Sequence, residues 1–232
     1  MAEAEPSTSE AAVEPAPPVE APNKPEPTGP APPAAPITLR APSSLKPTNE
    51  TSTGEIAVPP NLAWLEATWH VTHSTLPMWK KNRNVQINYT IIPNTSPAHI
   101  DDLVTYQSIS GTKVKTVHGV DKPFSPSNEN TGREQASLGY NWRGKGLLAI
   151  ASSKWEILGY GEEQGSGNRW VVTYFAKTLF TPAGVDIYSK DKQGLSKRTV
   201  EAIKAALAAL GGDVANLAKD LFAITMDNAR VS

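Results

Sequence analysis

Short segments in which apolar and polar residues alternate recur between residues 69 and 189 of this chain, and turn signals separate them. In RNVQINYTII, residues 83–92, every second residue from Val85 to Ile91 is apolar and the residues between them are polar. This two-residue period is typical of strands with one buried face. We therefore predict about eight short antiparallel strands. They lie at residues 69–75, 83–92, 102–109, 112–120, 136–142, 154–161, 169–179 and 185–189.

One strong helical pattern follows the strands. Residues 196–210 read SKRTVEAIKAALAAL, in which Ser196 can cap the helix start and Gly211-Gly212 can end it. Apolar residues from Val200 to Leu210 form one stripe, as an amphipathic helix requires. A shorter amphipathic stretch at 214–222 predicts a second helix, and 223–226 predicts a last strand.

Eight antiparallel strands with short turns favour an up-and-down barrel over a sandwich, because a barrel leaves no exposed sheet edge. The expected fold is thus all-β: an eight-stranded antiparallel up-and-down barrel with a C-terminal α-helix. Barrels of this size either fill with side chains or enclose one small ligand.

The first 58 residues have a different composition from the rest. They hold 13 of the 21 prolines and no Phe, Trp or Tyr. Eight Glu against Lys24, Arg40 and Lys46 give them a net charge of −5, which leaves +4 for residues 59–232. This segment has too little apolar surface to offset the chain entropy that folding would cost. We therefore predict a disordered Pro/Ala/Glu-rich tail over 1–58 and one barrel domain over 59–232.

Two readings of the tail stay open. Pro-Ala-Pro-Pro stands at residues 15–18 and again at 30–33, and such stiff segments suit a partner domain that binds polyproline II helices. A passive, solubilising tail is the reading we favour.

Composition argues against several classes of protein. The cations of residues 59–232 are scattered, so we expect no nucleic-acid binding. Cysteine is absent, and neither a secretory signal nor a long apolar run occurs, which predicts a cytoplasmic protein without a membrane span. His70 and His73 are three residues apart on a strand and are expected on opposite faces, so we predict no metal and no cofactor. No catalytic motif stands out, and we assign no catalytic residue.

Two motifs resemble those of the lipocalins, within the wider calycin superfamily. Leu65–His70, LEATWH, looks like the first lipocalin motif, with Ala67 where the family has Gly. Ile187–Lys190, IYSK, resembles the family's last strand, with Lys190 where the family has Arg. The resemblance implies that Trp69 closes one end of the barrel, that Lys190 packs over it, and that Trp79 lies in the first loop, over the open mouth.

A lipocalin-like barrel implies non-catalytic binding or transport of a small hydrophobic molecule. Which alternate set of strand residues points inward stays open, because a shift of one residue exchanges the faces. The expected ligand-binding residues are Trp79, Tyr106, Tyr140, Trp142, Trp155, Trp170 and Tyr174. Two alternatives remain: a barrel isomerase or cyclase, which buried carboxylates converging inside would favour, and a filled-barrel scaffold whose tail recruits partners.

Overall fold

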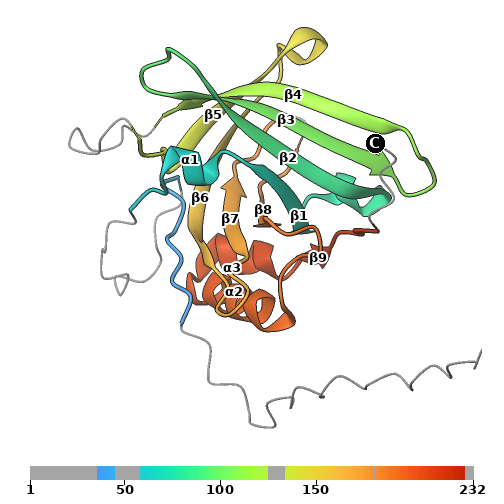
Figure 1. The fold of residues 1–232 in the computed structure, drawn as a ribbon. Coiled ribbons are helices and arrows are strands. Elements are labelled where there is room, and N and C mark those ends of the chain that lie inside the picture. The colour runs from blue at the N-terminus through green and yellow to red at the C-terminus, as the bar shows by residue number, and fades with distance from the viewer. Residues whose placement is uncertain (1–35, 45–57, 125–133, 180, 228–232) are drawn as a thin grey trace, which may run out of the picture. The chain divides into compact units, whose positions relative to one another are not determined.

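Eight antiparallel strands close into a barrel in the computed structural model, which describes residues 36–44, 58–124, 134–179 and 181–227 (Figure 1). The sheet runs in the order β2-β3-β4-β5-β6-β7-β8-β1, and β1 also pairs with β2, which closes it. A two-residue strand, β9 (Phe222–Ala223), adds to β1. The barrel strands are β1 (Thr68–Ser74), β2 (Asn82–Ile92), β3 (His99–Ser108), β4 (Val114–Pro123), β5 (Gly139–Gly144), β6 (Ser152–Glu162), β7 (Arg169–Phe175) and β8 (Gly184–Ser189).

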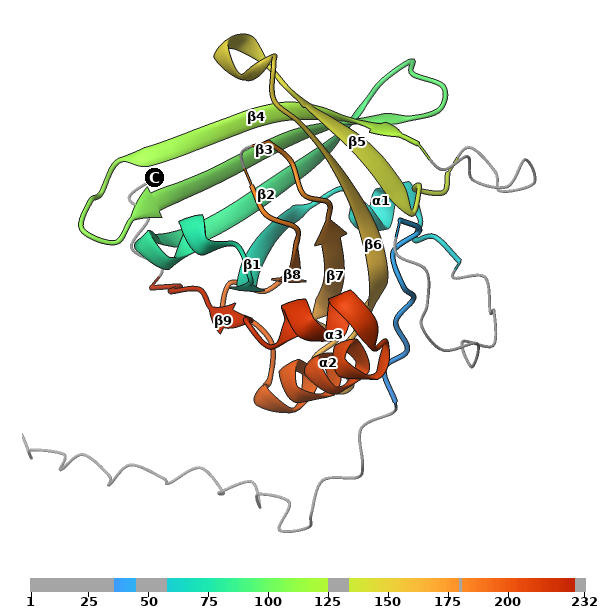
Figure 2. The ribbon, with the colours of Figure 1, turned by 180° about the vertical axis from the view of Figure 1, so that it is seen from behind.

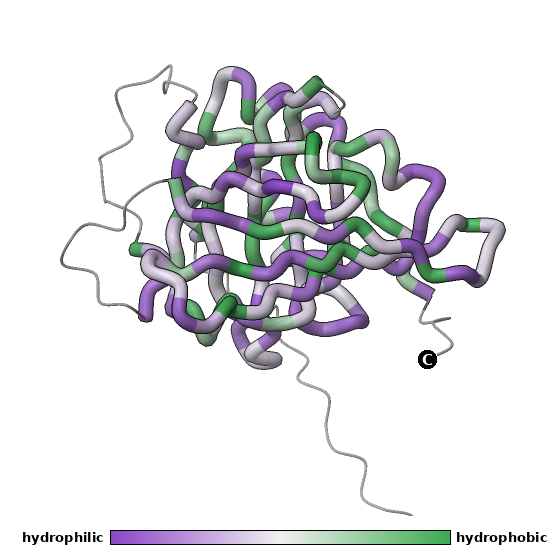
Figure 3. The backbone as a smooth tube through the Cα atoms, turned by 90° about the horizontal axis from the view of Figure 1, so that it is seen from above, coloured by the Kyte–Doolittle hydropathy of each residue, from purple (hydrophilic) through white to green (hydrophobic). Residues whose placement is uncertain are grey.

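This architecture confirms the predicted fold class, and each predicted strand is present within a few residues of its expected bounds. Hydrophilic and hydrophobic residues alternate along the strands (Figure 3). Within the described part of the chain, no helix has the length and apolar character needed to cross a membrane.

The two faces of the barrel wall bury two separate apolar clusters. The inner cluster holds Trp69, Ile87, Tyr140 and Trp155 among others. The outer cluster joins β7 and β8 to α2 (Lys197–Ala209) and α3 (Gly212–Ala218), the helices that cover one side of the barrel (Figure 2).

Helix α2 forms as its sequence predicts. The Ser196 hydroxyl accepts a hydrogen bond from the backbone N–H of Thr199 at 3.2 Å, which satisfies one of the free donors at the helix start. Val200, Ile203 and Leu207 form its buried stripe against the barrel. Each buried aliphatic side chain of this kind contributes about 2 kcal/mol through the hydrophobic effect.

Two β-bulges change which side chains point inward. In β1 the pairing with β8 shifts between Val71 and His73, so His70 pairs with Ser189 and His73 with Ile187. Ser189 and Ile187 are two residues apart and share a face, so His70 and His73 share it too, on the outer side. The prediction that these histidines lie on opposite faces is therefore wrong, because a bulge adds one residue to the strand.

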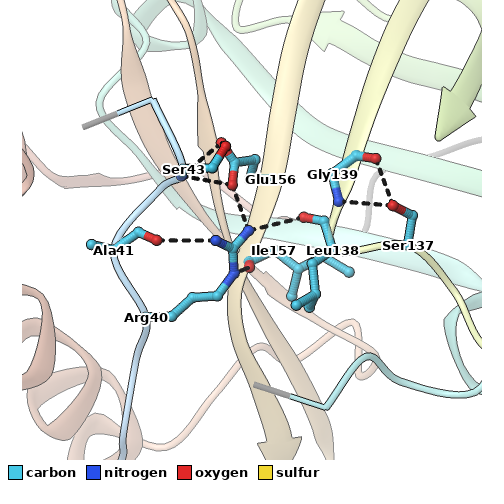
Figure 4. A network of polar contacts seen from close by, with 8 residues as sticks. All are labelled: Arg40, Ala41, Ser43, Ser137, Leu138, Gly139, Glu156 and Ile157. Carbon is cyan, nitrogen blue, oxygen red and sulfur yellow. Dashed lines mark hydrogen bonds and ion pairs between the residues drawn. The ribbon is translucent and has the colours of Figure 1, made fainter. Parts of the chain in front are cut away.

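The second bulge lies in β6, where Ile157 pairs with Thr173 and Gly159 with Val172. The extra residue, Leu158, packs in the outer cluster. Residues 36–44, predicted as part of a disordered tail, lie along this bulge, and we call them the strap (Figure 4). The rest of the predicted tail lies outside the described residues.

Arg40 holds the strap to the barrel through polar contacts with three residues of β6. Its backbone N–H donates to the Leu158 carbonyl at 2.8 Å and its Nε to the Ile157 carbonyl at 2.8 Å. One terminal nitrogen pairs with Glu156 Oε2 at 2.5 Å. Leu39 beside it packs over Gly159, where a Cβ would lie 2.4 Å from the Leu39 Cδ2.

Glu156 is buried beneath the strap, with 5% of its side chain exposed. Besides Arg40, it accepts hydrogen bonds from the backbone N–H of Ser43 at 2.9 Å and from the Ser43 hydroxyl at 2.8 Å (Figure 4). A buried carboxylate needs such partners, because its desolvation is otherwise uncompensated. The strap therefore neutralises a charge that the barrel wall carries.

We predict that Arg40→Ala lowers the free energy of unfolding by about 3 kcal/mol, because the Glu156 carboxylate stays buried without its cation. Chemical denaturation of the full chain measures this. Lys204→Ala, which breaks a surface ion pair with Glu201, is the control and should change stability by less than about 0.5 kcal/mol. Equal stabilities of Arg40→Ala and the control would show that the strap does not support the barrel.

Candidate binding site inside the barrel

The register of the strands decides which predicted ligand-binding residues face the barrel interior. Tyr140 and Trp155 pair with each other and belong to the inner cluster. Tyr106 and Trp142 pack against the same cluster and remain partly exposed. These four of the expected ligand-binding residues thus face the barrel interior.

Trp170 and Tyr174 lie on the opposite face of the wall. Both belong to the outer cluster, against the helices and the strap. Trp170 pairs with Ser189, and Tyr174 pairs with Glu156, which the strap covers. Their expected inward position is wrong, because the residues of β7 that face inward are Val171 and Thr173, one place along.

Trp79 lies in the connection between β1 and β2, in the short 3-10 helix η1 (Pro77–Lys81). Its ring meets Tyr106 edge to face, with centroids 5.2 Å apart, and 7% of the residue is exposed. Consecutive strands are antiparallel, so the connections alternate between the two ends of the barrel. We call the end that contains η1 the η1 end and the other the α1 end.

The α1 end is covered by α1 (Leu62–Leu65) and by aromatic rings. The indole N–H of Trp69, which is fully buried, donates to the Leu65 carbonyl at 2.9 Å. The cation over an indole at this end is Arg169, whose guanidinium carbon lies 5.5 Å from the centre of the Trp64 ring. Lys190, expected to pack over Trp69, is exposed at the end of β8.

Three carboxyl groups are buried on the inner face, and the sequence analysis missed all of them. Asp102 pairs with Gly119 and Asp121 pairs with Ile100, so the two aspartates are diagonal neighbours on β3 and β4. Asp186 lies across the barrel on β8. Asp101, the neighbour of Asp102 in the chain, lies on the outer side of the wall, where it pairs with Lys145 and His118.

Burial raises the pKa values of Asp102 and Asp121 above the ordinary range of a carboxyl group, and a neighbouring carboxylate adds to each: Asp101 beside Asp102, and Asp102 beside Asp121. Each also receives a hydrogen bond from an indole, which acts in the opposite direction: Trp155 Nε1 lies 2.7 Å from Asp121 Oδ1, and Trp142 donates to Asp102. Two carboxylates so close and so buried cannot both be ionised, so the pair retains a proton near neutral pH.

Gly119 makes room for this arrangement. A Cβ at that position would lie 2.2 Å from the Trp142 Nε1, so a side chain there would displace the indole. Because Gly119 has no side chain, the Trp142 ring can lie against β4 in the position from which it donates to Asp102.

Asp186 lies in a second polar group that adjoins the first. Its Oδ1 accepts a hydrogen bond from the Ser74 hydroxyl at 2.5 Å, and burial raises its pKa to about 7. Two positions on, the Tyr188 hydroxyl lies 3.1 Å from Thr173 Oγ1 and is also hydrogen-bonded to Tyr89. Burial raises the pKa of Tyr188, and the charges of Asp186 and Asp102 raise it further.

Not every oxygen of this interior has a partner. Among the described residues, the buried Asp102 Oδ1 and Asp121 Oδ2 accept or donate no hydrogen bond. Around them lie stacked rings: Tyr140 on Trp155 at 4.8 Å and Tyr89 on Trp155 at 5.7 Å between centroids. The inner face thus combines aromatic surface with a few convergent polar atoms, the composition of small-molecule sites.

A separate groove of about 570 Å³ lies on the outside of the barrel. It runs between the strap, the end of β6 and the first turn of α2, and its walls include Ile37, Tyr160 and Thr199. Trp170 contributes one wall, so the sequence-predicted residue lines this groove rather than the interior.

We predict that stability falls as pH rises from about 4 towards 7. The unfolded-state pKa of Asp186 is about 4 and the folded-state value about 7, so the native state holds the extra proton in this window. Asp186→Asn should reduce the slope by up to about 1.4 kcal/mol per pH unit. Urea denaturation across this range measures it, with the exposed Asp220→Asn as control. An unchanged slope in Asp186→Asn would refute the assignment.

Comparison with known proteins gives one related sequence. The chain is 29% identical over 155 residues to "Botcinic acid biosynthesis cluster B protein 12" of Botryotinia fuckeliana (strain B05.10), a match that covers 64% of this chain and 66% of that protein. The match therefore spans just under two thirds of the relative's length. The chain matches no protein-family model.

Two solved structures are similar at a low level. Apocrustacyanin C1 has a TM-score of 0.46 at 14% identity, over 69% of this chain and 77% of that chain. The siderocalin Ex-FABP has a TM-score of 0.42 at 12% identity, over 69% and 93%. Similarity this distant carries no functional argument. By the order and closure of its own strands and its C-terminal helix, the chain has the lipocalin-like calycin fold.

Proposed function

We propose that the barrel binds a small, largely apolar molecule that carries at least one oxygen acceptor, such as a carbonyl or hydroxyl group. The observation that carries the proposal is the pair of unpartnered oxygens, Asp102 Oδ1 and Asp121 Oδ2, buried among aromatic rings. Buried polar atoms are almost always hydrogen-bonded in native proteins, so such atoms mark a place for a ligand group or an ordered water.

The chemistry of the pair supports a neutral rather than a cationic ligand. A carboxyl group that retains its proton donates a hydrogen bond, and a carbonyl oxygen accepts one. The rings of Tyr140 and Trp155 would bury the ligand's apolar part, from which most of the affinity would come. Ligand contacts by Tyr106, Tyr140, Trp142 and Trp155 are part of this proposal, as is Trp79 at the η1 end.

The related sequence supports small-molecule biosynthesis as the process in which this binding would take place. The name of the Botryotinia protein assigns it to a cluster for the biosynthesis of botcinic acid. We extend this to the present chain only as a proposal: its ligand is an intermediate or product of small-molecule biosynthesis.

The buried acids favour a second candidate function, acid–base catalysis on the bound molecule. Catalytic carboxyl groups need a pKa near the working pH, and burial beside a like charge is how proteins achieve it. The Asp102–Asp121 pair would donate a proton to the bound molecule and accept a proton from it, as an isomerisation or a ring closure requires. Carriers need no such pair, which makes this arrangement the specific argument for an enzyme.

We predict that Val104→Trp weakens binding of the neutral fluorescent probe N-phenyl-1-naphthylamine at least about tenfold, or about 1.4 kcal/mol. Val104 packs against the inner cluster, so an indole there would occupy the interior. Leu103→Trp, on the other face of the same strand, is the matched control and should leave affinity within about twofold.

Energy transfer from tryptophan to the probe measures this binding. Equal affinities in both variants would contradict binding in the interior. Loss of binding on Thr38→Trp instead would place the ligand in the outer groove beside the strap.

We predict that Asp121→Asn keeps probe binding and abolishes conversion of the natural ligand, if the second candidate function holds. Mass spectrometry of organic extracts identifies molecules that co-purify with the full chain from its native host. Incubating those molecules with the protein and following them by liquid chromatography measures conversion. The exposed Asp213→Asn is the control. Stoichiometric binding without conversion by the unsubstituted protein would leave a carrier, and an empty extract would remove both functions.

A further inference from the structure

Among the residues that the structure describes, exposed large apolar side chains gather at the η1 end of the barrel. Eight large hydrophobic residues are exposed in the described parts of the chain, and seven of them lie in or beside the connections at this end. The eighth, Val58, precedes α1. The seven are Met78, Ile109, Val114, Leu147, Leu148, Ile150 and Leu179.

Three of these side chains are almost entirely in water. Leu147 is 102% exposed, Leu179 95% and Ile150 82%. Leu147 and Ile150 lie in the connection between β5 and β6, and Leu179 lies in the connection between β7 and β8. Single exposed apolar residues are ordinary, but seven gathered on four neighbouring connections mark an interaction surface.

The same connections carry only positive charge. We define the rim as residues 75–81, 109–115, 143–151 and 176–179. It contains seven cations and no Asp, Glu or His. All seven are exposed: Lys80, Lys81, Lys113, Lys115, Arg143, Lys145 and Lys177.

Three of the connections at the α1 end are different. Residues 93–98, 163–168 and 190–196 hold Glu163 and Asp191 against Lys190 and Lys192, a balanced charge. As described, they expose no large hydrophobic side chain. The combination of apolar tips and cations is therefore a property of one end rather than of loops in general.

We propose that the rim docks the barrel onto an anionic lipid bilayer. Aliphatic tips enter the boundary between headgroups and acyl chains, while the lysines beside them meet lipid phosphates and carboxylates. The four connections all lie at one end of the barrel, so this end would face the bilayer. In this orientation the η1 end of the barrel would face the bilayer, which is a reservoir of apolar molecules.

A protein partner fits the rim less well. The centres of protein interfaces are enriched in aromatic residues and depleted in lysine. Here the aromatic residue of η1, Trp79, is buried against Tyr106, and the exposed residues are aliphatic chains and lysines. This composition is the one that anionic membranes attract. The proposal does not depend on the ligand-binding function, because the exposed apolar side chains of the rim lie outside the inner cluster.

Co-sedimentation of the full chain with vesicles tests the proposal. The vesicles contain three parts phosphatidylcholine to one part phosphatidylserine, and pure phosphatidylcholine vesicles are the comparison. We expect the protein to bind the mixed vesicles, more weakly as salt rises, and to bind pure phosphatidylcholine at least about tenfold more weakly.

Two variants separate the apolar and the charged contributions. Leu147→Ser with Ile150→Ser should weaken vesicle binding about tenfold or more, because it removes the inserting side chains. Lys113→Gln with Lys115→Gln should weaken it by about fivefold for each lysine. All four residues are exposed, so both variants should fold normally.

The α1 end supplies the matched controls. Lys190→Gln with Lys192→Gln, and separately Val58→Ser, should change vesicle binding by less than about twofold, since these residues lie away from the rim. The proposal is overturned if the unsubstituted protein stays in solution with both kinds of vesicle, or if rim and control variants bind alike. If the unsubstituted protein forms a dimer and does not bind vesicles, and if Leu147→Ser with Ile150→Ser makes it monomeric, the rim would serve self-association instead.

Discussion

Closure of the sheet by β1 is the constraint on which the rest of this structure depends. Because β1 pairs with both β2 and β8, the eight barrel strands enclose an inside and an outside, and every strand residue belongs to one or the other. The inner face carries aromatic rings and the three buried aspartates, and the outer face carries the apolar side chains that α2 and α3 cover. Without closure the aspartates would face water and would titrate as ordinary carboxyl groups.

Bulges refine this division and create local sites. The extra residue in β6 turns Leu158 outward, and the strap binds the carbonyl groups of Ile157 and Leu158 beside it. Arg40 in turn neutralises Glu156 on the same stretch of wall. A segment far from β6 in the chain thus completes its outer face, while Gly159 leaves room for Leu39 to approach.

The interior and the rim suggest one division of labour between the two ends of the barrel. Aromatic residues and α1 cover the α1 end, whereas the η1 end carries apolar tips and cations. Taken with the proposed functions, an apolar molecule would pass between a bilayer and the interior at the η1 end. The buried pair Asp102–Asp121 would then hold its polar group far from water, where a hydrogen bond is strongest.

The sequence by itself determined the number and position of the strands, the capped helix 196–210 and hence the barrel, because these follow from local periodicity and turn chemistry. It also placed Tyr140 and Trp142, two residues apart, on one face of their strand. Only the tertiary structure decided which face is inside. A single added residue at a bulge reverses the face, as His73 illustrates, and the alternation along β7 does not say which of its faces turns inward, as Trp170 illustrates. The tertiary structure alone also joined Asp102 to Asp121 and Arg40 to Glu156, because pairing across a barrel brings together residues whose sequence separation carries no signal.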